Sequence, residues 1–194
     1  MNAREEILNA IRKNKPDAAP VPVIPVFQQP DNDLVKIFEE TILKIGGAFK
    51  ILNTANELRS YLDEIYPAKK IVVSNVNGYE STLLSSSVTH ASQLEEVDLA
   101  VLTGDMAVAE SASIWISDKA IPFRALPFIC QHLVLVFAAD DLVYNMHQAY
   151  QRINISESDY GVFIAGPSKT ADIEQSLVIG AHGPRSMTAI MLAE

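Results

Sequence analysis

The residues best suited to bind a ligand lie in a run that ends at Arg185. A strand-like apolar stretch leads into a turn that carries hydroxyl and basic side chains. Ligands in open α/β sheets usually bind beyond strand ends, so this turn is a candidate site. The candidate ligand-binding residues of the turn are Gly166, Ser168, Lys169 and Thr170. Ser168 or Thr170 can cap a following helix, whose exposed amides would hold a carboxylate or phosphate together with Lys169.

A loop from Gly180 to Arg185 follows and contains further polar candidates. Gly180 and Gly183 allow backbone conformations that other residues resist, so the loop can bring His182 and Arg185 beside the preceding turn. A guanidinium held in this way suits bidentate recognition of an anion. We therefore predict an anion site that includes His182, Gly183 and Arg185.

Structural roles are an alternative for the same residues. The turn can be an ordinary strand-to-helix connection with a capping residue. Asp172 and Glu174, which we include in the predicted binding set, also suit the first turn of a helix, where the dipole favours acids. Either acid can pair with Arg185, and His182 can bond to the backbone.

Cysteine and histidine are too sparse for a redox or metal centre. Cys130 is the only cysteine, so the chain forms no internal disulfide and supplies no multi-cysteine iron–sulfur or zinc site. His90, His132 and His147 lack a metal-ligand spacing. We predict no metal and no cofactor in this chain, and we expect any electron-carrying cluster to belong to a partner protein.

Charge and hydropathy narrow the classes of partner. The net charge of −9 disfavours nonspecific binding to nucleic acid or to anionic membranes, although a local basic patch can still bind a small anionic ligand. No apolar run approaches the roughly 18 residues of a membrane span. The first residues also lack the apolar stretch of a secretory signal. These features predict a cytoplasmic protein that binds no nucleic acid and no membrane.

Residues 1–30 form a predicted helical extension with a proline-rich arm. Ile7, Leu8 and Ile11 recur at helical spacing among charged residues, which indicates a short amphipathic helix. Prolines from Pro16 to Pro30 fix φ and remove amide donors, so an extended segment should follow the helix. The helix can dock on its own core or on a neighbouring subunit, which makes a homo-oligomer possible.

Residues 31–194 alternate between helical and strand-like patterns. Predicted helices cover 34–45, 54–66 and 140–152, and predicted strands cover 48–52, 70–74, 97–103, 113–117, 132–138, 162–165 and 187–192. Short β-branched runs such as 70–74 are typical of strands that are buried on both faces. The alternation favours βαβ units, so we predict one α/β domain with a parallel sheet.

Three segments of this domain carry a family resemblance. One is Gly-Pro-Ser-Lys-Thr-Ala-Asp-Ile-Glu-Gln from Gly166, followed by Leu-Val-Ile-Gly-Ala-His-Gly-Pro-Arg up to Arg185. The others are Ala-Glu-Ser-Ala-Ser over 109–113 and the stretch from Arg124 to Pro127. Together they resemble the lactate utilization protein C (LutC) family, whose members carry a LUD domain. That family usually has Ala-Glu-Thr-Gly-Thr at the second segment, so Ala112 replaces a glycine.

The resemblance implies a fold, and analogy with other proteins of that fold suggests a candidate catalytic residue. The implied fold is a Rossmann-like sheet of the ribose-5-phosphate isomerase and CoA-transferase group. In such a fold, Glu110 at a strand-to-loop junction can act as nucleophile or general base. Alternatively, its carboxylate orders the turn from Ser111 to Ser113.

The resemblance also implies a part in the oxidation of L-lactate to pyruvate. The leading hypothesis is an accessory, ligand-binding subunit that holds an anion at the 161–185 loops while iron–sulfur and other lactate-oxidation subunits move electrons. One alternative is a structural scaffold for an iron–sulfur partner. The other is an enzyme of the CoA-transferase or isomerase type that uses Glu110.

Overall fold

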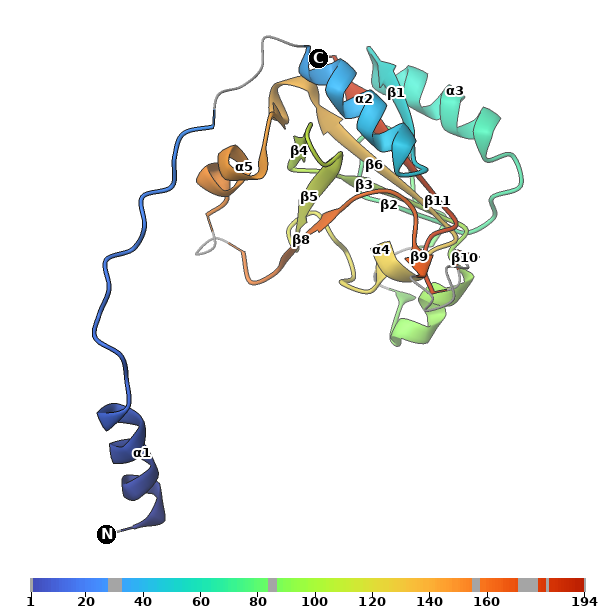
Figure 1. Ribbon diagram of the computed structural model, residues 1–194. Helices are drawn as coiled ribbons and strands as arrows, with labels where there is room; N and C mark the ends of the chain where they lie inside the picture. The colour runs from blue at the N-terminus through green and yellow to red at the C-terminus, as the bar shows by residue number, and fades with distance from the viewer. Residues whose placement is uncertain are drawn as a thin grey trace. The chain divides into compact units, whose positions relative to one another are not determined.

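The computed structural model describes residues 2–27, 33–83, 87–154, 158–170, 178–180 and 182–193. The chain divides into two compact units, Met1–Pro30 and Asp31–Glu194. Figure 1 shows the helices and strands of each unit, coloured along the chain. Within the described ranges, no helix is long and apolar enough to cross a membrane.

The first unit contains the predicted helix, α1 (Ala3–Lys13), and the predicted extended arm. The helix begins with reciprocal capping, because the Asn2 side chain accepts from the Arg4 amide at 3.0 Å and the Glu5 carboxylate accepts from the Asn2 amide at 3.4 Å. No side chain of α1 is buried. Residues 15–27 form neither helix nor strand, as their prolines predict.

The second unit is built on a five-stranded parallel sheet with the order β1-β11-β6-β3-β2. Its strands are β1 (Ala48–Leu52), β2 (Val72–Ser74), β3 (Leu99–Thr103), β6 (His132–Ala138) and β11 (Ser186–Leu192). The chain starts at one edge, crosses to the other edge and returns strand by strand to pair β11 with β1. The predicted α/β class and parallel sheet are confirmed, although β2 and β3 are each two residues shorter than predicted.

The parallel sheet is covered on both faces. The helical elements are α2 (Leu34–Lys44), α3 (Ala55–Ile65), η2 (Ala91–Glu96), α4 (Leu126–Ile129), η3 (Ala139–Asp141) and α5 (Met146–Arg152). On one face, Phe38 of α2 shares an apolar cluster with Leu135 of β6. On the other face, Leu62 of α3 shares a cluster with Val136, the next residue of β6. Both faces of β6 are therefore buried, which explains its continuously apolar sequence.

A second sheet of four strands packs against the parallel sheet. Its order is β7-β4-β5-β8, with β4 (Met106–Val108), β5 (Ser113–Ser117), β7 (Leu142–Val143) and β8 (Gly161–Ile164). Ala107 and Ile114 of this sheet belong to the same apolar cluster as Phe38 and Leu135. Of these strands, β4 contacts β6, and Figure 1 shows the two side by side. A two-stranded sheet of β9 (Lys169–Thr170) and β10 (Val178–Ile179) completes the described strands.

The predicted helix over 140–152 is wrong in its first half. Residues 139–141 form the short η3 helix, and residues 142–143 form β7, which pairs with β4. Helix α5 begins only after Asn145, whose side chain accepts from the Gln148 amide at 2.9 Å. The apolar residues of this segment do recur at helical spacing. Strand pairing and the Asn145 cap override that pattern.

Ala112 adopts a backbone conformation that normally requires glycine. Among the described residues other than glycine, it alone has a positive φ, of 50°. Its methyl group is fully buried between β4 and β5. The position where the family resemblance expects glycine thus keeps a glycine-like conformation, which costs an L-residue roughly 1–2 kcal/mol.

This strain predicts how substitutions at Ala112 behave. Ala112→Gly relieves the backbone strain but also removes a buried methyl group, whose burial contributes a similar free energy. The free energy of unfolding should therefore change by less than about 1 kcal/mol. Ala112→Val adds β-branching where φ is positive and the core is full, so it should lose more than about 2 kcal/mol. Urea denaturation measures both. A valine variant as stable as the wild type would show that residue 112 is not left-handed.

Candidate functional site

The predicted anion-binding loop borders a groove at the amino end of β6. This groove, which we call the Arg185 groove, has a volume of about 770 Å³. Its lining residues are Glu95, Ala125, Phe128, Ile129, Gln131, Gly180, His182, Gly183 and Arg185. The side chains of His182 and Arg185 are exposed there.

Close backbone approach fixes the wall of the groove. A Cβ on Gly183 would lie 2.9 Å from the Ser168 Cβ, and a Cβ on Gly180 would lie 2.6 Å from the Arg185 Cγ. The Ser168 amide donates to the Pro184 carbonyl and the Gly180 amide donates to the Ser168 carbonyl, both at 3.0 Å. The turn at Ser168 and the loop from Gly180 to Arg185 therefore lie side by side.

The residues that follow Ser168, where we predicted the start of a helix, form a short strand. Lys169 and Thr170 form β9, which pairs with β10 in antiparallel fashion. Ser168 therefore does not cap a helix that begins at the next residue, whereas a helix capped by Thr170 would begin outside the described residues. Gly166, with φ of 71°, makes the turn into this strand. Asp172 and Glu174 lie outside the described residues.

Arg185 gives the groove its positive charge. Its amide donates to the Gln131 carbonyl at 2.8 Å, which ties the loop to the start of β6. Burial lowers the pKa of His132, the charge of Arg185 lowers it further, and Asp98 opposes both effects. Nδ1 of His132 is 2.7 Å from Ser186 Oγ. In the part of the chain that the structure describes, no carboxylate forms an ion pair with Arg185.

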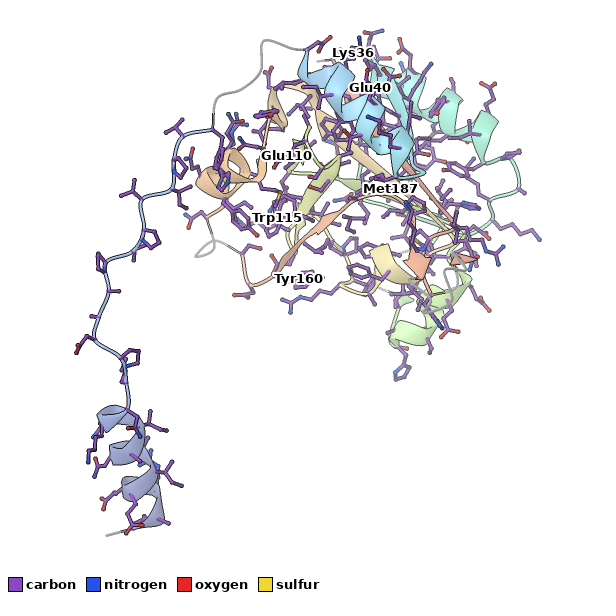
Figure 2. All side chains as sticks on the ribbon, viewed as in Figure 1. Lys36, Glu40, Glu110, Trp115, Tyr160 and Met187 are labelled. Atoms are coloured by element: carbon purple, nitrogen blue, oxygen red, sulfur yellow. The ribbon has the colours of Figure 1, made fainter. Side chains whose placement is uncertain are left out.

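Glu110 lies apart from the Arg185 groove, beside α5 (Figure 2). Its Oε1 accepts from the Met146 amide at 2.8 Å, and its own amide donates to the Tyr144 carbonyl at 3.0 Å. The carboxylate thus satisfies the first free amide of α5. Close by, the Ser111 and Ser113 hydroxyls are 2.7 Å apart. The carboxylate thus contacts the start of α5, and the alternative in which it orders the turn from Ser111 to Ser113 stays a prediction.

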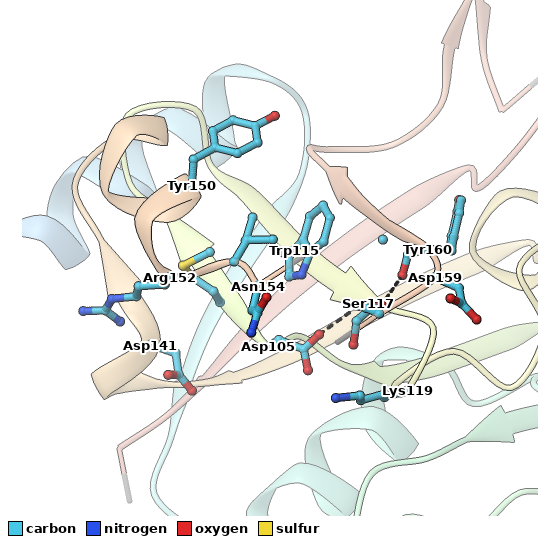
Figure 3. Close-up of a pocket in the computed structure, with 14 residues that line it drawn as sticks. Asp105, Trp115, Ser117, Lys119, Asp141, Tyr150, Arg152, Asn154, Asp159 and Tyr160 are labelled. Atoms are coloured by element: carbon cyan, nitrogen blue, oxygen red, sulfur yellow. Dashed lines mark hydrogen bonds between the residues drawn. The ribbon is translucent and has the colours of Figure 1, made fainter. Parts of the chain in front are cut away.

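A second hollow, which we call the carboxyl-edge cavity, lies at the other end of β6. It holds about 750 Å³ and is bordered by segments that follow β3, β5 and β6 and by the start of β8. Its charged lining residues are Asp105, Lys119, Asp141, Arg152 and Asp159, and its aromatic ones are Trp115, Tyr150 and Tyr160. In Figure 3, Asp105, Lys119 and Asn154 gather below the Trp115 indole.

Local contacts hold Asp105 in the carboxyl-edge cavity. The Gly104 amide donates to the Val136 carbonyl at 2.7 Å and extends the β3–β6 ladder by one residue. A Cβ on Gly104 would lie 2.3 Å from an Ile114 methyl group, so glycine is needed there. Asp105 emerges directly afterwards, and its Oδ2 accepts from the Ser117 amide at 2.8 Å. The carboxylate is therefore oriented by the backbone of β5.

Asp141 is the electrostatically perturbed residue of this cavity. Burial raises the pKa of its carboxyl group, Arg152 lowers it, and the charges of Asp140 and Asp105 raise it again. The two cavity carboxylates thus lie close enough to interact, and a cation lies nearby. Residues with perturbed pKa values that line a cavity are candidates for binding or catalysis.

Among the described residues, neither hollow brings together a recognisable set of metal ligands. No group of three or more His, Cys, Asp or Glu side chains in the described ranges is arranged to hold a metal ion. Cys130 is buried, and burial raises the pKa of its thiol to about 12. Such a thiol stays protonated at neutral pH and is a poor nucleophile or ligand.

Sequence reasoning missed the carboxyl-edge cavity for a specific reason. Asp105 and Lys119 follow strands that were predicted, so the rule that ligands bind beyond strand ends pointed to them. Asp141 and Arg152 were hidden, because both fell inside the helix predicted over 140–152. Because Leu142 and Val143 pair with β4 as strand β7, Asp141 lies directly before a strand and not inside a helix.

Comparisons with known proteins agree on one family. Residues 85–192 match the LUD domain. A lactate utilization protein C of Anoxybacillus flavithermus is 28% identical over 188 residues, which cover 87% of this chain and 85% of that protein. A protein of the same name from Deinococcus radiodurans is 26% identical and covers 96% of this chain and 92% of its own length.

A solved structure supports the fold. The crystal structure of a DUF162 family protein from Deinococcus radiodurans superposes with a TM-score of 0.66, at 19% identity. The similarity covers 82% of this chain and 96% of the other. At this level of identity the likeness establishes the fold and leaves the chemistry of the two hollows to be argued from their own residues.

The cap made by Glu110 predicts a stability effect. Glu110→Ala should lower the free energy of unfolding by about 1 kcal/mol, because the Met146 amide loses its acceptor. Glu110→Gln keeps an acceptor oxygen and should lose less. The control is Glu40→Ala on the exposed surface of α2 (Figure 2), which should stay within about 0.5 kcal/mol. Equal stability of Glu110→Ala and the wild type in urea denaturation would contradict the cap.

Removing the charge of Asp141 should stabilise the protein, whereas removing the Glu110 carboxylate should destabilise it. A raised pKa means that the folded state binds the proton more tightly than the unfolded chain, so the ionised carboxylate opposes folding above that pKa. Asp141→Asn should therefore raise the free energy of unfolding at pH 7. The gain should shrink as the pH falls through the raised pKa toward the ordinary value of 3.8. Glu39→Gln on α2 is the charge-matched control, and a less stable Asp141→Asn would refute the expectation.

Proposed function

Because the chain belongs to the LUD domain family, we propose that it acts in lactate utilization by binding a short organic acid in the Arg185 groove. The role in lactate utilization is taken from relatives named lactate utilization protein C, which this chain matches over most of their length. The binding role rests on one observation in this chain. A loop held by Gly180 and Gly183 presents Arg185 and His182 to a groove of about 770 Å³.

The chemistry of the groove suits a 2-hydroxy or 2-oxo acid. A guanidinium binds a carboxylate through two parallel hydrogen bonds, which fixes its orientation as well as its charge. His182 can donate to or accept from an oxygen on the next carbon, according to its tautomer. Gln131 and the exposed ring of Phe128 complete a wall with one polar and one apolar part. L-lactate and pyruvate each carry a carboxylate, one oxygen on the next carbon and a methyl group, which match the arginine, the histidine and the apolar part of the wall.

The chain serves this system as an accessory subunit, and iron–sulfur and other lactate-oxidation subunits carry the electrons. The single cysteine supports this division, because it is buried and cannot ligate a cluster by itself. We assign the core to the ribose-5-phosphate isomerase and CoA-transferase group. Five parallel strands with a smaller mixed sheet on one face support that assignment.

Substitution of Arg185 tests the binding role. The wild type should bind L-lactate and pyruvate in isothermal titration calorimetry. Arg185→Ala should weaken the binding at least about tenfold, because a charge-assisted bidentate contact is lost. Arg59→Ala, which removes an exposed arginine of α3, should leave the affinity unchanged.

Two results would refute the proposal. One is a wild type that binds neither acid. The other is an Arg185→Ala protein that binds as tightly as the wild type, which would place the ligand elsewhere. If Arg185 served only in a structural ion pair, its removal would lower the stability and the wild type would release no heat with either acid.

A further inference from the structure

We propose that the carboxyl-edge cavity is a second binding site, and that its ligand is a mononucleotide. The base lies on Trp115, the ribose hydroxyls bond to Asp105 and Asp141, and the phosphate pairs with Lys119. This site lies at the end of β6 opposite to the Arg185 groove and does not depend on the function proposed for that groove. Its volume of about 750 Å³ is within the range of small-molecule sites.

Trp115 supplies a flat aromatic wall that the protein holds in place. Its ring packs on Phe163 with centroids 4.8 Å apart, and Tyr150 contacts the same Phe163 at 5.9 Å. A Cβ on Gly161 would lie 2.1 Å from the indole, so glycine is needed for the ring to rest against β8. The indole is only half-buried, and it lines the cavity with its remaining surface. A nucleic-acid base of any type can stack on such a ring.

Asp105 and Asp141 supply two carboxylates at the ends of neighbouring strands. Asp105 follows β3, and Asp141 follows β6, which pairs with β3. One oxygen of Asp105 is held by the Ser117 amide at 2.8 Å, which leaves the other available to a ligand. A carboxylate beyond a strand end is the usual acceptor for a ribose hydroxyl in α/β nucleotide sites. Two of them suit the two adjacent hydroxyls of one ribose.

Lys119 supplies the positive charge that a phosphate needs, while Arg152, whose Nη1 donates to the Asp140 carbonyl at 3.4 Å, offsets the charge of Asp141. In Figure 3, the Arg152 and Asp141 side chains lie on one side of the hollow and Lys119 lies below Asp105. Lysine and arginine are the usual protein partners of phosphate oxygens. In a chain with a net charge of −9, the cations beside the three aspartates of the cavity also reduce the repulsion that any anion would meet.

The single tryptophan makes the proposal directly measurable. Trp115 is the only tryptophan of the chain, so its fluorescence reports on this cavity alone. Titration of the full chain with AMP should quench the fluorescence in a saturable manner, and calorimetry should give the same affinity. AMP should bind at least about tenfold more tightly than adenosine or ribose 5-phosphate, and inorganic phosphate should bind more weakly still.

Variants locate the ligand. Asp141→Asn and Lys119→Gln should each weaken AMP at least about fivefold, since each removes a charge-assisted contact. Lys36→Gln removes an exposed lysine of α2 (Figure 2) and should leave AMP binding unchanged. Trp115→Leu, followed by calorimetry, should also weaken AMP. Circular dichroism verifies that each variant is folded.

Three outcomes would overturn the proposal. If AMP neither quenches Trp115 nor releases heat, the cavity is not a nucleotide site. If ribose 5-phosphate binds as tightly as AMP, the base does not stack and the ligand is a sugar phosphate. If Lys119→Gln and Asp141→Asn bind AMP like the wild type, AMP binds elsewhere. Lactate binding in the Arg185 groove is measured separately, so neither proposal stands or falls with the other.

Discussion

Burial of β6 on both faces is the constraint on which the rest of the structure depends. Leu135 packs under α2 and the second sheet, while Val136 packs under α3. β6 pairs with β11 along seven residues and with β3 along five. Its ends are thereby fixed, and each end borders one of the two hollows. Gln131 precedes the strand at the Arg185 groove, and Asp141 follows it at the carboxyl-edge cavity.

The two hollows differ in charge and in how they are shaped. The Arg185 groove presents a cation and a histidine on a loop whose glycines admit no side chain. The carboxyl-edge cavity combines carboxylates, cations and an indole on short segments between strands. In both, glycine allows a functional side chain to lie against backbone, as Gly180 does for Arg185 and Gly161 does for Trp115.

Most of the sheet was predictable because its strands are short, apolar and separated by helical patterns. β1, β5 and β6 have the predicted bounds. The failures lie where pairing partners distant in sequence decide the structure. β7 and β9 have two residues each, too few for a periodic pattern, and each forms only because another strand lies beside it. The Arg185 loop was found from its glycines, whereas Asp141 was concealed by apolar residues at helical spacing.

We propose that Arg185 recognises the carboxylate of a short organic acid. The most direct measurement is an NMR titration that follows the Arg185 side-chain Nε–H and the Trp115 indole N–H in one spectrum while pyruvate is added. If Arg185 binds the carboxylate, its signal should shift in a saturable manner while the Trp115 signal changes little. An unchanged Arg185 signal, at pyruvate concentrations that saturate the calorimetric response, would contradict it.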